Sequence, residues 1–254
     1  WRKAGWSSIN KMLRAPFVVA SVVLVSSLII GINQYWVLIS FVVCSVPVTT
    51  VLQELVRGTK SRHSRGENWG FAFLSLLGAN RPRYGGYIVH LSIVMLAIGI
   101  TASSFYDVQK DVVMKPGDSE ILGKYTFTYL EVSEKSYPDR LEETAKFEVW
   151  SGDKYIGYMY PYRAVYPEFQ IAATRGAIHS TVLEDFYLVP SEFMEDGEAV
   201  FRVLINPLVL WMWVSGPVLV LGTLVSLSPN SRKHRKRVRL PSMGMDQNPL
   251  GMAK

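Results

Sequence analysis

The stretch Tyr84–Ser104, YGGYIVHLSIVMLAIGITASS, contains no Asp, Glu, Lys or Arg. A helix rises about 1.5 Å per residue, so a run of this length can cross the roughly 30 Å of hydrocarbon in a bilayer. The stretch therefore predicts a membrane-spanning helix, from which the rest of the chain can be worked out in both directions.

Three other long runs share this apolar character, at residues 16–32, 35–55 and 206–227. Asn33 and Gln34 separate the first two runs by a tight turn, so these two spans are expected to form a helical hairpin. The chain begins with Trp1 and not with Met, so we expect it to be a fragment, a processed product or one piece of a larger protein. Together the runs predict a bundle of four transmembrane helices.

Basic residues flank the predicted spans at only one end of each. Before the first span, between the second and third, and after the fourth lie Arg2, Lys3, Lys11 and Arg14; Arg57, Lys60, Arg62, Arg65, Arg81 and Arg83; and Arg232, Lys233, Arg235, Lys236, Arg237 and Arg239. Basic residues close to the spans stay in the cytoplasm, so both termini are predicted to be cytoplasmic. The domain organisation is then residues 1–104 with three spans and a cytoplasmic loop, an extracytoplasmic domain at 105–205, and the last span with a basic tail at 206–254.

The segment 105–205 holds 18 of the 21 acidic residues and only 10 basic ones. The net charge of +6 is therefore a signal of membrane topology, and no nucleic acid partner is expected. Short runs of β-branched and aromatic residues lie between turn residues and predict strands; they are 125–132, 147–150, 155–160, 186–189 and 200–204. We expect six or seven strands, and hence an inserted antiparallel β-domain of the small barrel or sandwich type.

Several kinds of chemistry have no support in the residues. Cys44 is the one cysteine, which excludes an intrachain disulfide and a cysteine-rich zinc site within this chain. There is no CxxCH motif for covalent haem, and no GxSxG, HExxH or phosphate-binding loop. Four spans with a single ionisable residue deep inside one of them also give no evident transport pathway.

The four histidines are His63, His90, His179 and His234. His63 and His234 lie in basic stretches and are expected to be solvated, and a surface or capping role is expected for His179. His90 lies inside a predicted span, where an ionisable side chain is costly and needs a partner. Its face of the helix carries small residues, so it is either a hydrogen-bonded structural histidine or a metal or haem ligand.

The stretch Asn80–Leu91, NRPRYGGYIVHL, resembles the R-x-R-Y-G-G-Y-x-x-H signature of the CcmF family of haem-handling membrane proteins in cytochrome c maturation. Residues 206–213 resemble the last membrane helix of this family, and 115–118 and 185–188 resemble its outer domain. The resemblance covers residues 80–230 well and the first two spans loosely.

The resemblance implies a part of a holocytochrome c synthetase in a bacterial-type inner membrane, not catalytic alone. Family members take haem from the chaperone CcmE and help to attach it to apocytochrome c, with CcmH as a partner. They are also thought to hold a transmembrane haem b between two histidines, and His90 matches the second. This implies a cofactor site of His90 with Arg83, Gly86 and Tyr87, in which Arg83 either pairs with a haem propionate or marks the membrane boundary.

The tryptophan-rich haem platform and the first histidine of the family belong to its N-terminal half, and no Trp-Trp-Asp occurs in this chain. The sequence is therefore predicted to be a C-terminal half that needs an N-terminal half or subunit for the second ligand. The competing interpretation is a membrane-anchored scaffold without cofactor that presents its external β-domain to a partner. His90 separates the two, because a scaffold gives it no task beyond a hydrogen bond.

Overall fold

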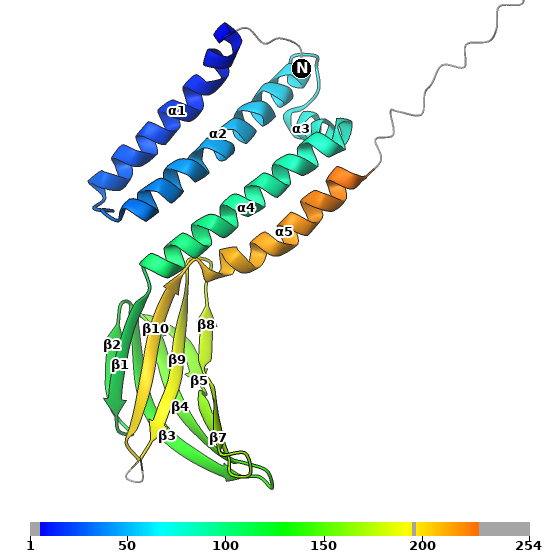
Figure 1. Ribbon diagram of the computed structural model, residues 1–254. Helices are drawn as coiled ribbons and strands as arrows, with labels where there is room; N and C mark the ends of the chain where they lie inside the picture. The colour runs from blue at the N-terminus through cyan, green and yellow to red at the C-terminus, as the bar shows by residue number, and fades with distance from the viewer. Residues whose placement is uncertain (1–5, 195–196, 229–254) are drawn as a thin grey trace, which may run out of the picture.

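The computed structural model describes residues 6–194 and 197–228, with side chains from residue 13 onward. A group of helices lies at one end of the molecule and a β-sandwich at the other (Figure 1). The fold class predicted from the sequence, membrane helices carrying an inserted antiparallel β-domain, is confirmed, and the β-domain is a sandwich.

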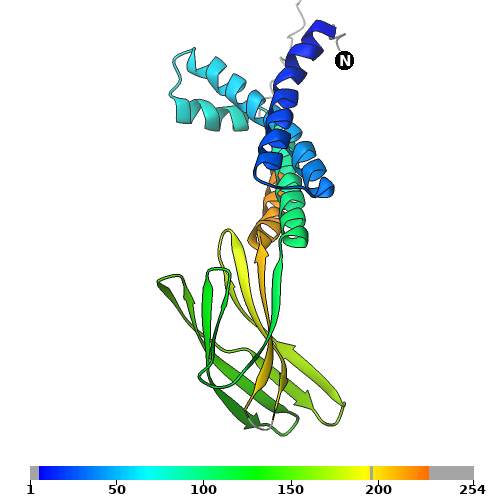
Figure 2. The same cartoon turned by 90° about the vertical axis from the view of Figure 1, so that its left-hand side faces the viewer.

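The five described helices are α1 (Trp6–Ile29), α2 (Tyr35–His63), α3 (Trp69–Ala79), α4 (Arg81–Phe105) and α5 (Val209–Leu227). Of these, α2, α4 and α5 are long and apolar enough to cross a membrane. The first predicted span falls on α1, whose apolar stretch Leu13–Ile29 is shorter, and α1 lies beside α2 as its hairpin partner (Figure 1). Helix α3 is short and apolar, and it projects sideways with the end of α2 (Figure 2).

The sandwich contains ten strands in the described part of the chain, more than the six or seven predicted. They are β1 (Val108–Met114), β2 (Ser119–Leu122), β3 (Tyr125–Ser136), β4 (Leu141–Ser151), β5 (Lys154–Met159), β6 (Tyr162–Tyr166), β7 (Ile171–Arg175), β8 (Ala177–Ser180), β9 (Glu184–Phe193) and β10 (Ala199–Pro207). The predicted number of strands was too small because the missed strands are short or exposed. Strand β7, for example, is exposed along its whole length. Such strands lack the apolar alternation that marks a half-buried strand.

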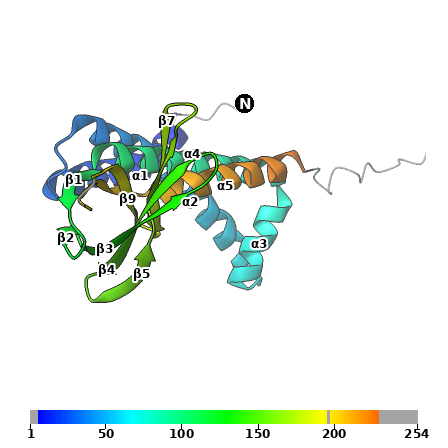
Figure 3. The ribbon, with the colours of Figure 1, turned by 90° about the horizontal axis from the view of Figure 1, so that it is seen from below.

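The strands form two antiparallel sheets that pack face to face, seen from below in Figure 3. One sheet has the order β1-β10-β9-β8, and the other has the order β2-β3-β4-β6-β7 with β5 also paired to β4. Strands β5 and β6 share one edge of β4, and Pro161 lies at the break between them. Proline has no N–H for the ladder, which explains why the edge is interrupted there.

Alternation along β3 places Tyr125, Phe127 and Tyr129 in the core between the sheets. The ring of Phe147 meets the ring of Phe201 from the opposite sheet at 4.7 Å between centroids, in an edge-to-face arrangement. Aromatic pairs of this geometry add to the stabilisation from buried area. The largest fully buried side chains of the core are therefore aromatic, which suits two sheets about 10 Å apart.

Two turns between strands have a glycine with positive φ. Gly117 has φ +100° and Gly152 has φ +56°, values that glycine adopts without steric cost. Asp118 accepts a hydrogen bond from the backbone N–H of Lys115 at 2.8 Å, which closes the β1–β2 turn. Gly152 lies at the tip of the β4–β5 hairpin, and its N–H donates to the carbonyl of Lys124 at 2.8 Å.

The helices and the sandwich are joined by two neighbouring strands. Helix α4 leads into β1 and strand β10 leads into α5, while β1 and β10 pair from Val108↔Ile205 to Met114↔Ala199. Helices α4 and α5 approach each other closely. A Cβ added at Gly222 of α5 would lie only 2.9 Å from the backbone nitrogen of Val89 in α4. The α4–α5 helix pair therefore continues directly into the β1–β10 strand pair.

Replacing Phe147 by Ala is expected to destabilise the sandwich by about 3–5 kcal/mol, because a fully buried ring leaves a cavity between the sheets. Phe169→Ala is the matched control, since Phe169 is largely exposed and its loss should change stability by less than about 0.5 kcal/mol. Pulse proteolysis in urea measures both. Equal losses for the two variants would contradict this assignment of the core.

Burial between the sheets raises the pKa of Tyr129 to about 12, and Glu143 adds to the effect. In the unfolded chain the pKa of a tyrosine is about 10. The stabilisation that the neutral phenol contributes is therefore complete below about pH 10 and is lost as the pH rises through about 12. Unfolding free energies measured across this range should fall less steeply for Tyr129→Phe than for the unchanged protein, and parallel curves would rule this out.

Candidate functional site

His90 lies in the first half of α4 with its side chain exposed among the described residues. Its Nδ1 is 2.8 Å from the carbonyl oxygen of Gly86, one helical turn earlier. A carbonyl oxygen only accepts hydrogen bonds, so Nδ1 must carry the proton, and in the neutral ring Nε2 then holds the lone pair. Among the described residues, none forms a hydrogen bond with Nε2, the atom that can coordinate a metal, and the side chain is exposed.

The helix face around His90 is open. A Cβ added at Gly86 would meet nothing within 4 Å, and Ile93, one turn further along, is 51% exposed. The neighbouring Gly85 lies about 100° further round the helix, where a Cβ would clash with the backbone of Ser226 in α5. The two adjacent glycines thus divide the helix between a face packed on α5 and a face that carries His90.

A polar cluster joins α4 to α2 one to two turns before His90. The guanidinium of Arg83 forms an ion pair with Glu54 of α2 at 2.7 Å, and its Nε donates to the Tyr87 hydroxyl at 2.9 Å. The rings of Tyr84 and Tyr87 meet edge to face at 5.7 Å. Arg83 and Tyr87 therefore contact each other and Glu54, while His90 and Gly86 lie on the open face.

Glu54 was not among the predicted site residues. The available signal was a carboxylate within the predicted span 35–55, where an acidic side chain needs a partner as much as a histidine does. Its cationic partner is distant in the sequence, so pairing with Arg83 could only be found once α2 and α4 were placed side by side.

The remaining described histidines have partners other than His90. His63 is exposed, stacks on Trp69 at 4.5 Å between ring centroids, and lies 2.8 Å from the carbonyl oxygen of Glu67 through Nδ1. His179 of β8 is partly buried, and its ring lies edge to face with the ring of Tyr125, with 6.5 Å between the ring centroids. His234 lies outside the described residues. Within residues 6–194 and 197–228, no group of three His, Cys, Asp or Glu side chains could hold a metal ion.

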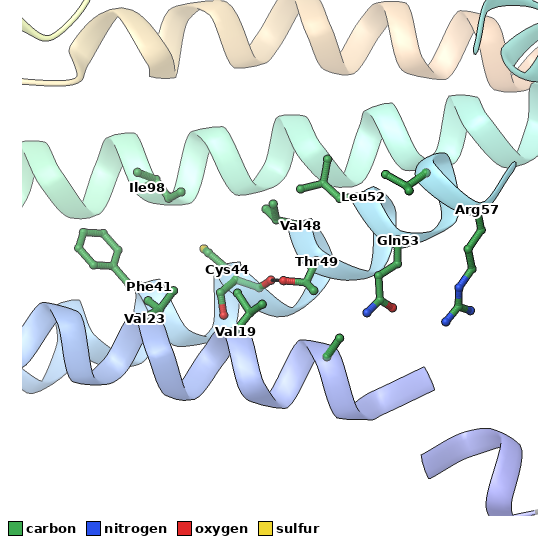
Figure 4. A pocket seen from close by; sticks show the side chains of 13 residues that line it. Val19, Val23, Phe41, Cys44, Val48, Thr49, Leu52, Gln53, Arg57 and Ile98 are labelled. Atoms are coloured by element: carbon green, nitrogen blue, oxygen red, sulfur yellow. Dashed lines mark hydrogen bonds between the residues drawn. The ribbon is translucent and has the colours of Figure 1, made fainter. Parts of the chain in front are cut away.

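An apolar groove of about 730 Å³ lies between α1, α2 and α4 (Figure 4). Its walls include Val23, Phe41 and Ile98, with Gln53 and Arg57 towards one end (Figure 4). The lining contains Cys44 but no histidine, so the groove offers no imidazole for coordination. We therefore treat the exposed face of α4 as the candidate site.

The comparisons with known proteins agree on one family. Residues 105–207 match the family described as the CcmF C-terminal beta-sandwich. CcmF of Escherichia coli strain K12, a cytochrome c-type biogenesis protein, is 30% identical over 177 residues, covering 70% of this chain and 26% of the relative. CcmF of Pseudomonas aeruginosa is 30% identical over 159 residues, covering 63% of this chain and 24% of the relative.

A solved structure titled "Cytochrome c Heme Lyase CcmF" superposes on 90% of this chain and 36% of its own length, with a TM-score of 0.69 and 20% identity. This likeness shows a shared fold. The chain spans about a quarter of the length of the curated relatives it matches.

The fold and these matches group the chain with membrane proteins that are named cytochrome c-type biogenesis proteins. Within that class it belongs to the CcmF family and corresponds to the C-terminal part of those proteins. The resemblance drawn from the NRPRYGGYIVHL stretch is thereby confirmed.

The two adjacent glycines of α4 allow a matched test of the site geometry. Gly85→Ala is expected to lower the thermal stability by about 1–3 kcal/mol, because its Cβ would lie only 2.7 Å from the carbonyl oxygen of Gly222. Gly86→Ala meets open space and should be neutral or slightly stabilising, since Ala favours a helix over Gly by about 1 kcal/mol. Thermal unfolding in lipid nanodiscs distinguishes the two, and equal behaviour would contradict the two-faced helix.

Proposed function

We propose that this chain is a haem-handling part of a cytochrome c maturation system and that His90 supplies one axial ligand to a transmembrane haem b. The observation that carries the proposal is the hydrogen bond of His90 Nδ1 to the Gly86 carbonyl, which leaves Nε2 available for coordination on an exposed side chain of an apolar helix. Ligating histidines characteristically donate their second N–H to such an oxygen, which fixes the tautomer and the ring orientation.

The residues around His90 fit a large flat group. Gly86 has no side chain, and a Cβ added there would have no neighbouring atom within 4 Å. A macrocycle could therefore approach the helix backbone on this face. The described residues provide one imidazole here, and the groove between α1, α2 and α4 provides none. The second axial ligand is then expected from a partner, most simply an N-terminal CcmF half or subunit.

We assign Arg83 and Tyr87 a positioning role, in contrast to the ligand role of His90. With its guanidinium held by Glu54 at 2.7 Å and by Tyr87 at 2.9 Å, Arg83 fixes α4 against α2. We infer that this pairing positions the face that carries His90. A haem propionate near this end of the helix would compete with Glu54 for the Arg83 guanidinium. Arg83 could therefore bind a propionate in place of Glu54.

A haem held by two neutral imidazoles supplies one-electron redox chemistry when it is bound. The residues of this chain would contribute the ligand, its orientation and an apolar surrounding. In this proposal the β-sandwich is extracytoplasmic, both termini are cytoplasmic, and the sandwich presents a surface to the haem chaperone CcmE, to CcmH or to apocytochrome c. The basic residues at one end of each span support this orientation.

The proposal is tested by optical spectroscopy on the chain purified with its N-terminal partner. His90→Ala is expected to remove the reduced-minus-oxidised bands of haem b, whereas the control His63→Ala should leave them unchanged, because the His63 ring stacks on Trp69 and its Nδ1 is used by the Glu67 carbonyl. His90→Met adds a positive readout, since exchanging His for Met as axial ligand raises the reduction potential. Haem bands and potential that are the same in all variants would exclude His90 as a ligand.

The same experiment separates the proposal from a scaffold without cofactor. A scaffold predicts that no haem copurifies with the pair of proteins and that His90→Ala affects only helix packing. Thermal unfolding of His90→Ala, recorded alongside the spectra, identifies that case.

A further inference from the structure

The hairpin turn between β8 and β9 has two large apolar residues at its tip, Val182 and Leu183. They are 63% and 65% exposed among the described residues. Tight hairpin turns normally carry Gly, Asn or Asp, whose backbone and side chains suit the turn and tolerate water. This turn is closed instead by Thr181, whose N–H and hydroxyl both donate to the carbonyl of Glu184 at 2.9 and 2.7 Å. Two exposed aliphatic side chains on a rigid turn indicate that something apolar covers them.

The position of the tip is fixed by the first turn of α5. The backbone N–H of Leu208 donates to the carbonyl of Leu183 at 2.8 Å, and the indole N–H of Trp211 donates to the carbonyl of Val182 at 3.0 Å. Both carbonyls at the tip are therefore used by the start of a helix that is long and apolar enough to cross a membrane. Leu208 takes a left-handed conformation, φ 57°, which brings α5 directly against the turn.

These contacts set the depth of the tip in the bilayer. If α5 spans the membrane, its first turn lies at the boundary between headgroups and hydrocarbon, and a loop hydrogen-bonded to that turn lies at the same level. Trp213, 75% exposed, and the half-exposed Phe105 at the end of α4 lie at this same end of the helices. Tryptophan and other aromatic residues concentrate at this boundary.

We propose that the β8–β9 tip, Val182 and Leu183, inserts into the acyl–headgroup region of the bilayer and forms a second attachment of the sandwich besides its two covalent connections to α4 and α5. The occupant of this surface is phospholipid, because the tip is continuous with the lipid-facing start of α5. Burying two aliphatic side chains removes apolar area from water, while the ion pair of Lys124 with Glu184 at 2.8 Å remains at the polar level just outside. The inference rests on the fold alone and does not depend on haem binding by His90.

The test uses site-directed spin labels on the full chain in phospholipid nanodiscs. Cys44 is the one cysteine, so Cys44→Ser gives a background for Val182→Cys and Leu183→Cys. The matched control is Val113→Cys, because Val113 is also an exposed valine, at 58%, but lies near the far end of β1 from the membrane helices. Accessibility to oxygen, which partitions into lipid, is compared with accessibility to a water-soluble nickel chelate.

The expected result is that oxygen dominates over the nickel chelate at both Val182 and Leu183, with the ratio inverted at Val113. Free collision of the nickel chelate with the labels at the tip would place it in water and overturn the proposal. Shielding of these labels from both reagents would show a protein contact in place of lipid and would overturn it equally. Unchanged circular dichroism and thermal unfolding establish that each labelled variant is folded, and two neighbouring tip positions guard against a local effect of one substitution.

Discussion

The contact between α4 and α5 at Gly85 and Gly222 is the constraint on which the rest of the molecule depends. The helices approach so closely that no side chain fits at either position. The interface is therefore held by dispersion contacts between the helices, together with the hydrogen bond that the Ser226 hydroxyl donates to the Pro82 carbonyl at 3.2 Å, as is usual for small residues in membrane helix pairs. Because α4 and α5 continue into the paired strands β1 and β10, this contact also sets how the sandwich meets the helices.

The same contact determines what α4 can offer to a cofactor. One side of the helix is used by α5, and Arg83 ties another part of it to Glu54 on α2. Between these contacts, Gly86 has open space beside it and the His90 side chain is exposed. A histidine inside an apolar segment is unfavourable unless it has a partner, and a single backbone carbonyl satisfies only one of its two nitrogens. The unmet demand of the other nitrogen is the physical reason to look for a ligand there.

The sequence allowed a good deal of this to be predicted. The uncharged run 84–104 indicated a membrane helix, the short β-branched and aromatic runs indicated strands, and the motif ending in His90 indicated the family. Strands such as β7 were missed because exposed edge strands carry no apolar alternation. The link between Glu54 and Arg83 was missed because it joins residues far apart in the chain, and no local pattern reports such a pair. The apolar residues at the Val182 tip differ from the usual composition of a turn. Their role could be inferred only from the hydrogen bonds that join the tip to the start of α5.

The pairing of Val108 with Ile205 has a consequence for how such a protein can arise. Adjacent strands lie about 4.8 Å apart, so the chain leaves the helices and returns to them at almost the same point. To the helical hairpin of α4 and α5, the whole sandwich is equivalent to a long connecting loop. Domains whose ends lie this close together are the kind that can be inserted, exchanged or enlarged without disturbing the host. The helix pair and the sandwich can thus vary independently in evolution, provided that the two strands joining them remain side by side.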